Sequence, residues 1–286
     1  MKIMAVLAAS LTFLGTALAQ GPARQAEKVA HCGGFLEGAA FDGNGYLWIV
    51  DLKSANILRV KEGACEIVAN TGGAPNGARF HKDGRLFITD NKRGVLALDV
   101  RSKMLSVIVD SLDGQPLRGL NDLAFDHAGG AYITDPNGSS ATDRKGRLLY
   151  LTASGQISVV EHGLSFPNGV AVSSDPNYVF VGQFTDKSIL MIPSVANREP
   201  MKSTFVHIRT VGGLGPDGMV LSSDGGLMWA QFGSGSLGRA DSAGNLGRSV
   251  SLPKGAGHFV TNVAVKDGWA YLTEAQYGDV WRVPVE

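Results

Sequence analysis

The chain has little charge, few cysteines and no long apolar run beyond its first residues. Only 18% of its 286 residues are charged, and 26 basic side chains balance 26 acidic ones. Balanced charge gives no electrostatic attraction to nucleic acid or to an anionic membrane, so we expect neither as a partner. The 11 prolines contrast with 38 glycines, about 13% against a typical ~7%. So many glycines indicate a turn-rich, all-β fold, and 44% hydrophobic residues exclude a disordered chain.

Several common catalytic motifs are also missing. The sequence has no Gly-x-Ser-x-Gly turn, which carries the nucleophile of many serine hydrolases, and no glycine motif for phosphate binding. Its two cysteines, Cys32 and Cys65, have neither Cys-x-x-Cys spacing nor a nearby histidine cluster, so they do not indicate zinc. They either form a disulfide or remain separate buried thiols.

The first 19 residues have the features of an export signal. Lys2 is followed by an almost entirely apolar run from residue 4 to residue 18, and Ala17-Leu18-Ala19 fits the cleavage rule. The run is too short for a stable membrane span, which needs ~20 apolar residues. We therefore expect residues 1–19 to be a cleaved signal peptide and residues 20–286 to form a single domain, periplasmic or secreted. A buried N-terminal helix is the alternative.

A repeated segment is the most informative feature of the remaining chain. Six short runs of β-branched and aromatic residues, the types that strands favour, recur 39 to 48 residues apart. Most follow a hairpin turn such as Asp83-Gly84. The runs are Leu47–Asp51, Leu86–Asp90, Ala131–Asp135, Val179–Gln183, Leu227–Gln231 and Ala270–Glu274.

A period near 45 residues with hairpin turns is typical of a four-stranded propeller blade. Six repeats therefore predict an all-β, six-bladed β-propeller with four antiparallel strands per blade, whereas a sandwich or a barrel predicts no such period. The last blade ends after its third strand, Asp279–Val285. We expect Lys28–His31 to supply the fourth strand, which would close the ring between the two termini of a monomer.

An oxygen-bearing side chain lies ten to twelve residues before the second residue of each repeat. The six positions hold Glu37, Asn76, Asn121, Asn168, Asp217 and Thr261, the last followed by Asn262. Because the innermost strands of a propeller line its channel, six equivalent starts would direct these groups at one spot on the axis. The alternative at any one position is a turn, which Asn and Asp form on their own.

Two carboxylates in one channel mouth, Glu37 and Asp217, are costly unless a cation neutralises them. Together with asparagine carbonyls they form an all-oxygen set that suits Ca²⁺ or Mg²⁺ rather than zinc or copper. Glycines follow four of the polar residues, and we expect them to leave room for the cation and its substrate. These glycines are Gly38, Gly77, Gly169 and Gly218.

Several of these segments resemble the gluconolactonase/regucalcin (senescence marker protein) superfamily. Phe166–Ala171 and Gly215–Gly218 look like its hallmark motifs, and Leu120–Asp126 is similar to the corresponding segment of gluconolactonases. Four such motifs occur in order at blade spacing, and the resemblance covers about residues 33–283. It implies a six-bladed propeller with one catalytic divalent cation in its channel.

Carried over by motif, the resemblance makes Glu37, Asn168 and Asp217 metal ligands and Asn121 a fourth ligand or a substrate contact. Ca²⁺ is the expected ion, with Mg²⁺, Zn²⁺ or Mn²⁺ as alternatives. The implied reaction is hydrolysis of a small-molecule lactone. Phosphoester hydrolysis or other chemistry at the same site, or a non-enzymatic binding propeller, are the alternative functions.

Asp217 is the first candidate for the catalytic base, and Glu37 is the second. Asn76, Asp122 and His258 are further candidate substrate contacts; they join Asn121 in that role.

Two departures from the family pattern concern specificity. The usual Glu-Gly-Pro-x-Trp is here Glu37–Phe41, which retains the glutamate but changes the local turn. Sugar-lactone members often carry an arginine where this chain has Gly119, which argues against an aldonolactone substrate.

Overall fold

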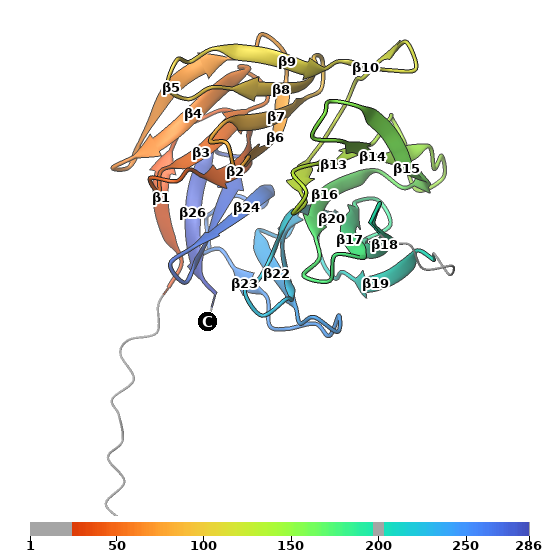
Figure 1. The fold of residues 1–286 in the computed structure, drawn as a ribbon. Coiled ribbons are helices and arrows are strands. Elements are labelled where there is room, and N and C mark those ends of the chain that lie inside the picture. Colours follow the sequence, from red (N-terminus) through yellow and green to blue (C-terminus); the bar gives the residue numbers. More distant parts are fainter. Residues whose placement is uncertain (1–24, 197–202, 286) are drawn as a thin grey trace, which may run out of the picture.

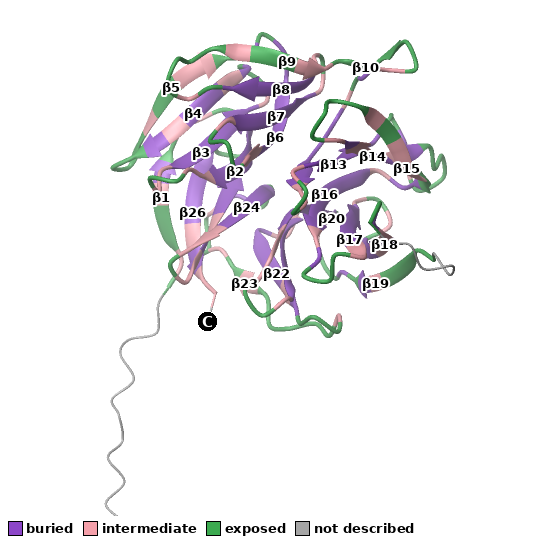
Figure 2. Ribbon diagram, viewed as in Figure 1, coloured by how far each residue is buried: buried purple, intermediate pink, exposed green. Residues whose placement is uncertain are grey.

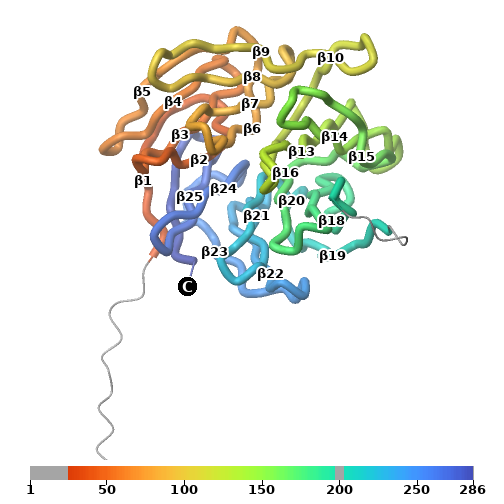
Figure 3. The backbone as a smooth tube through the Cα atoms, in the orientation of Figure 1, coloured from red at the N-terminus to blue at the C-terminus, as the bar shows by residue number. Residues whose placement is uncertain are grey.

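Each of the six sequence repeats forms the second strand of a four-stranded antiparallel sheet in the computed structural model (Figure 1). The structure describes residues 25–196 and 203–285, so the predicted signal peptide lies outside the described residues. The backbone tube in Figure 3 passes from sheet to sheet around a common centre. This arrangement confirms the six-bladed, all-β propeller predicted from the repeat.

The first three blades follow one another along the chain. Blade 1 contains β2 Leu36–Phe41, β3 Leu47–Asp51, β4 Asn56–Lys61 and β5 Ala64–Asn70. Blade 2 contains β6 Pro75–Phe80, β7 Leu86–Asp90, β8 Gly94–Leu98 and β9 Leu105–Val109. After a small hairpin of β10 Ser111–Leu112 and β11 Gln115–Pro116, blade 3 contains β12 Leu123–Phe125, β13 Ala131–Asp135, β14 Gly146–Leu151 and β15 Ile157–Leu164.

The other three blades complete the ring. Blade 4 contains β16 Pro167–Val172, β17 Tyr178–Gln183, β18 Ser188–Pro193 and β19 Phe205–Arg209. Blade 5 contains β20 Gly215–Leu221, β21 Leu227–Phe232, β22 Ser236–Ala240 and β23 Val250–Ser251. Blade 6 contains β24 Val260–Lys266, β25 Trp269–Glu274, β26 Asp279–Pro284 and β1 Glu27–His31.

Both ends of the chain meet in blade 6, where β1 pairs antiparallel with β26 and confirms the predicted closing strand. Asp279 strengthens this seam, because its carboxylate lies 2.7 Å from Lys28 Nζ and 2.8 Å from His31 Nδ1. Directly after β1, Cys32 forms a disulfide with Cys65 of β5. The disulfide therefore joins the closing strand of blade 6 to the outer strand of blade 1.

The hydrophobic core consists of six clusters, each lying between two adjacent blades. One of them packs Trp48 and Ile57 of blade 1 against Leu86 and Leu96 of blade 2. Figure 2 shows the consequence, with buried residues on the inner strands and exposed residues along outer strands such as β9 and β19. Within the described ranges, no helix is long and apolar enough to cross a membrane.

We predict that the Cys32→Ala/Cys65→Ala double variant is less stable than the parent chain. A cross-link over 33 residues restricts the unfolded state, and this effect corresponds to about 3–4 kcal/mol of unfolding free energy. Urea unfolding with and without reductant measures it. Reductant should destabilise the parent chain and leave the double variant unchanged; equal sensitivity to reductant would contradict the disulfide.

Candidate metal centre in the axial channel

A β-bulge at the start of the inner strand turns the polar residue toward the axis. The pairing register shifts between Glu37 and Ala40 in blade 1, and between Pro167 and Val170 in blade 4. Blades 2, 5 and 6 have the same irregularity at the equivalent place. A bulge removes a residue from the strand ladder and re-aims its side chain. This geometry explains how five of the six equivalent strand starts present their polar groups to one channel; the inner strand of blade 3 pairs without such a shift.

Threonines of the second strands hold the starts of the inner strands. Thr89 Oγ1 accepts a hydrogen bond from Gly77 N at 2.9 Å, and Thr134 Oγ1 accepts one from Asp122 N at 2.9 Å. Each hydroxyl also donates to a main-chain carbonyl of the following blade, Thr89 to Asn121 and Thr134 to Asn168. The repeat motif thus contains the side chain that positions its neighbour's polar residue.

The structure buries the predicted ring of polar residues. Glu37 and Asn168 are 4% exposed and Asp217 is 5% exposed, so these side chains are almost completely shielded from bulk water. The Asn168 side chain donates a hydrogen bond to Asp217, and Glu37 is electrostatically coupled to Asp217. These three predicted ligands therefore come together.

The other candidate residues differ in burial. Asn76 and Asn121 are also buried, at the equivalent strand starts of blades 2 and 3. His258 is exposed on the loop before β24, where its imidazole lies beside Gly235 of the β21–β22 loop.

Two oxygens of this cluster have no protein partner. Oε2 of Glu37 and Oδ1 of Asn168 are buried and accept no hydrogen bond. Buried polar atoms are almost always satisfied, so two unpartnered oxygens beside a second carboxylate fit a hard cation. Among the described residues, no three His, Cys, Asp or Glu side chains are grouped to hold a metal, so amide oxygens, water or substrate would complete the coordination.

The negative charges of the clustered carboxylates repel one another, which raises the pKa values of these groups. Burial raises the pKa of Glu37 well above its ordinary value, and the nearby carboxylates of Asp217 and Asp122 raise it further. The pKa of Asp217 is also raised well above its ordinary value, first by burial and then by Asp122. Without a cation, the cluster therefore favours the protonated forms of these acids.

Asp122 lies one residue after the ring position, and it crosses the channel. Its carboxylate is 1% exposed, accepts a hydrogen bond from Leu123 N at 2.9 Å, and also bonds with Val170 N and the Asn262 side chain. Burial still raises the pKa of Asp122. Asp122, predicted as a substrate contact, thus has its oxygens engaged within the protein.

The glycines after the polar residues have a different role from the one expected. A Cβ on Gly77 would come within 2.6 Å of Asp122 Oδ1, and one on Gly218 within 2.3 Å of Asn262 Nδ2. Likewise, a Cβ on Gly169 would lie 2.2 Å from the carbonyl oxygen of Asp217. The glycines therefore allow neighbouring inner strands and the crossing side chains to approach, and the space is filled by protein rather than reserved for a cation and its substrate.

Arg79 is a site residue that the sequence analysis missed. Its guanidinium donates to the carbonyls of Ala39 at 3.1 Å and Met219 at 3.2 Å, and it lies 3.4 Å from both Asp122 Oδ2 and Asn262 Oδ1. It therefore links inner strands of four other blades across the axis. Arg79 also lines a pocket of about 290 Å³ with residues from the far ends of the inner strands.

A signal for Arg79 was present in the repeat. It lies three residues after Asn76, where the other blades have small or apolar residues: Ala40, Ala124, Ala171, Val220 and Ala264. A single long cation among five short side chains can cross the channel because its neighbours leave the space. The three carboxylates Glu37, Asp122 and Asp217 against one guanidinium would leave two negative charges when all are ionised, which one divalent cation balances.

Together, the fold and this cluster define a class of protein: a six-bladed propeller with an all-oxygen, acidic site on its axis. Within that class, the chain belongs to the SMP-30/gluconolactonase/LRE-like family, whose profile matches residues 35–275. This match confirms the resemblance seen in the motifs.

Individual relatives are distant. The chain is 29% identical over 152 residues to a gluconolactonase of Zymomonas mobilis, and this match covers 47% of this chain and 42% of that protein. It is 28% identical over 155 residues to a diisopropyl-fluorophosphatase of Loligo vulgaris, and this match covers 49% of this chain and 49% of that protein. The chain thus matches about half the length of these curated relatives. A calcium-binding protein, regucalcin, from Agrobacterium tumefaciens shares the fold, with a TM-score of 0.76 at 19% identity over 92% of this chain and 94% of that one.

We predict that Arg79→Met destabilises the protein by about 3 kcal/mol, because it leaves Asp122 buried without its guanidinium partner. Arg85→Met is the matched control, since Arg85 and its partner Asp83 are both more than a third exposed, and such pairs contribute about 1 kcal/mol or less. Urea denaturation of both variants measures the difference, and equal midpoints would contradict the role of Arg79.

We also predict that metal-free protein loses stability as the pH rises. The folded-state pKa values of Glu37 and Asp217 lie above the ordinary 4.5 and 3.8, so the folded state keeps protons that the unfolded state releases. Their contribution is therefore present below about pH 4 and lost as the pH rises through the raised values. In EDTA, the melting temperature should be lower at about pH 8 than at about pH 5, and added Ca²⁺ should raise it more at the higher pH. In the Glu37→Gln/Asp217→Asn variant both differences should shrink; an unchanged pH profile would assign them to other groups.

Proposed function

We propose that the protein is a metal-dependent hydrolase that opens a lactone ring, with Ca²⁺ as the preferred ion and Mg²⁺, Zn²⁺ or Mn²⁺ as alternatives. The observation that carries this proposal is the pair of unpartnered buried oxygens on Glu37 and Asn168, next to Asp217. Family membership supports hydrolysis of a lactone, and the structural neighbour described as calcium-binding supports the choice of ion.

In this proposal, Glu37, Asn168 and Asp217 would hold the cation, and Asn121 would be a fourth ligand or a substrate contact. A bound divalent cation would act as a Lewis acid that polarises the lactone carbonyl. Asp217 accepts the proton of the attacking water, and Glu37 is the second candidate for that role. Water adds to the carbonyl carbon, the ring C–O bond breaks, and the ring oxygen takes up a proton, which gives a hydroxy acid. The Asn76 and Asn121 amides are available to bind the substrate at the mouth, and His258, on the loop before β24, is a further candidate substrate contact.

Phosphoester hydrolysis is the second candidate reaction. The similarity to a diisopropyl-fluorophosphatase favours it, since the same Lewis acid would polarise a phosphoryl oxygen as well as a carbonyl. A non-enzymatic binding propeller is the remaining alternative, but it gives no reason for three carboxylates on the channel axis.

We also propose that residues 1–19 are removed on export and that residues 20–286 act as a single domain, a monomer in the periplasm or outside the cell. The Cys32–Cys65 disulfide supports this location, because such bonds persist in oxidising compartments.

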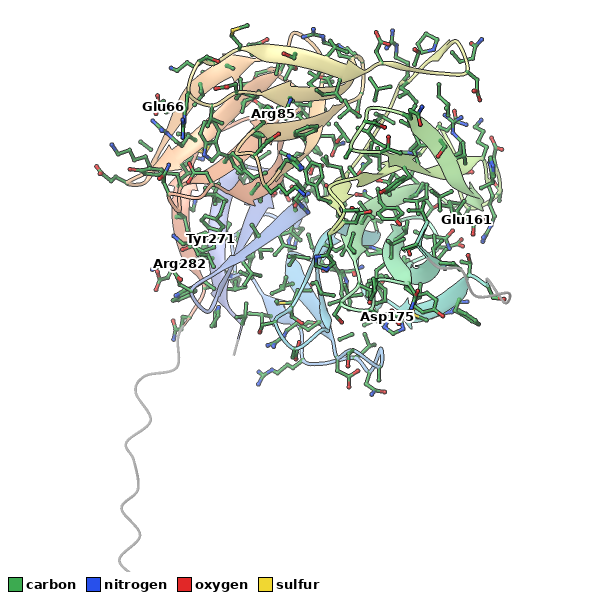
Figure 4. The ribbon with its side chains drawn as sticks, in the orientation of Figure 1. Glu66, Arg85, Glu161, Asp175, Tyr271 and Arg282 are labelled. Carbon is green, nitrogen blue, oxygen red and sulfur yellow. A yellow bond between two sulfur atoms is a disulfide. The ribbon has the colours of Figure 1, made fainter. Side chains whose placement is uncertain are left out.

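We expect Asp217→Asn to lower kcat/KM for lactone hydrolysis by about 10²–10⁴-fold, the usual contribution of a positioned base, and to weaken Ca²⁺ binding. Asp175→Asn is the matched control, because Asp175, labelled in Figure 4, is exposed in the turn between β16 and β17, outside the candidate site. A pH-stat assay over sugar, aromatic and aliphatic lactones, with calorimetric Ca²⁺ titration, measures both effects.

Two outcomes would contradict the proposal. If EDTA-treated parent protein bound neither Ca²⁺ nor Mg²⁺, the metal-dependent mechanism would be lost. Full activity of Asp217→Asn on every lactone that the parent opens would remove Asp217 from its assigned role.

A further inference from the structure

Four phenylalanines lie at the same end of the propeller as the polar cluster. Phe166 and Phe259 immediately precede the inner strands β16 and β24, two residues before Asn168 and Thr261. Phe184 directly follows β17, and Phe232 ends β21, opposite the first residue of β20. Because the second strands run antiparallel to the inner ones, all four side chains start from the edge where the ring of polar residues begins.

The four rings form one continuous arc across blades 4, 5 and 6, which we call the aromatic rim. The ring centroids of Phe166 and Phe184 are 5.6 Å apart, and those of Phe184 and Phe232 are 5.7 Å apart. Phe232 and Phe259 stack almost in parallel, with centroids 4.7 Å apart. Each contact is in the range where aromatic pairs attract one another.

The rim is not part of the hydrophobic core. Phe259 is 37% exposed, and Leu214 and Val211 on the loop before β20 are 54% and 69% exposed. Leu214 is tied to this arc, because its amide donates to the carbonyl of Phe232 at 2.7 Å. Exposed apolar side chains that adjoin one another commonly mark a binding surface.

Phe166 is held in a strained backbone conformation. Its φ is +48°, a left-handed value that is uncommon for a bulky side chain and costs about 1 kcal/mol or more. Its amide donates to Ser139 Oγ at 2.9 Å, and its carbonyl accepts from Phe184 N at 3.0 Å. These partners hold the Phe166 backbone in this conformation at the channel mouth, and strain of this kind concentrates at functional sites.

The mouth lacks these rings over blades 2 and 3, whereas blade 1 carries Phe35 at the equivalent position. In blades 2 and 3, the positions equivalent to Phe166 and Phe259 hold Ala74 and Gly119. Exposed cations lie there instead: Lys92 follows β7, and Arg118 precedes Gly119, whose amide donates to Asn91 O at 2.8 Å. The mouth therefore carries a cluster of aromatic rings over blades 4–6, with Lys187 beside it, and exposed cations without such rings over blades 2 and 3.

From this asymmetry we propose that the aromatic rim binds an aryl or bulky alkyl substituent on the substrate's ring, so that the preferred substrates are apolar-substituted lactones rather than polyhydroxylated sugar lactones. This inference rests on the proposed lactonase function. The basic side suits the carboxylate of the hydroxy-acid product, because Lys92 and Arg118 would attract it as it forms.

The test compares Phe232→Ala and Phe259→Ala with Phe205→Ala, a matched control on the outer strand β19 that is 50% exposed and lies on the outer edge of blade 4. For a phenyl-substituted δ-lactone, the two rim variants should lose about tenfold in kcat/KM, mainly through KM. For glucono-δ-lactone, they should stay within about twofold of the parent. The Phe205→Ala variant should match the parent on both substrates.

A binding measurement separates this inference from the proposed function. The phenyl-substituted δ-lactam resists hydrolysis, and calorimetry should show about tenfold weaker binding to the rim variants than to the control. If the parent opens no lactone yet binds the lactam through the rim, the proposed function fails and the apolar subsite stands. If the rim variants lose both lactones equally, or bind the lactam as the parent does, the aromatic rim does not select the substrate.

Discussion

The mutual repulsion of buried carboxylates on the propeller axis is the constraint on which the rest of the structure depends. Glu37, Asp122 and Asp217 are each 5% exposed or less, and their pKa values are all raised. Arg79 offsets one of these charges, which leaves a demand for positive charge where two oxygens have no hydrogen-bond partner. Such a cluster lowers the free energy of unfolding unless a ligand supplies positive charge. The same carboxylates that destabilise the metal-free fold therefore favour binding of a cation.

The surrounding structure concentrates these groups through devices that repeat from blade to blade. Bulges in five blades turn the first residues of the inner strands toward the axis, and threonines of the second strands, such as Thr89 and Thr134, hold these strand starts. Glycines and alanines around the channel then leave space for the few side chains that cross it. Thus Arg79 and Asp122 reach partners in other blades, and the ring is held together at its centre as well as by the six interblade cores.

Much of the fold could be predicted because repetition is visible without coordinates. The hairpin turns and strand runs recur once per blade, so the strand order, the closing strand Lys28–His31 and the equivalent positions of Glu37, Asn168 and Asp217 around the channel could all be predicted from the repeat. Arg79 was overlooked for the same reason, since it occurs in one blade only and a repeat emphasises what blades share. The role of Gly77 was misjudged because the sequence does not show that Asp122 of the next blade occupies the space beside it.

The sequence by itself determined the architecture and the chemical type of the axial residues, because strand period and residue identity are local properties of the chain. Tertiary structure decided which of these residues interact. Only the closed ring places Asn168 against Asp217, spans the channel with Arg79, and lines up Phe166, Phe184, Phe232 and Phe259 as one surface. Apart from the Phe166–Phe184 pair within blade 4, these contacts join residues from different blades. Their distances depend on the curvature of the whole ring, which no single segment encodes.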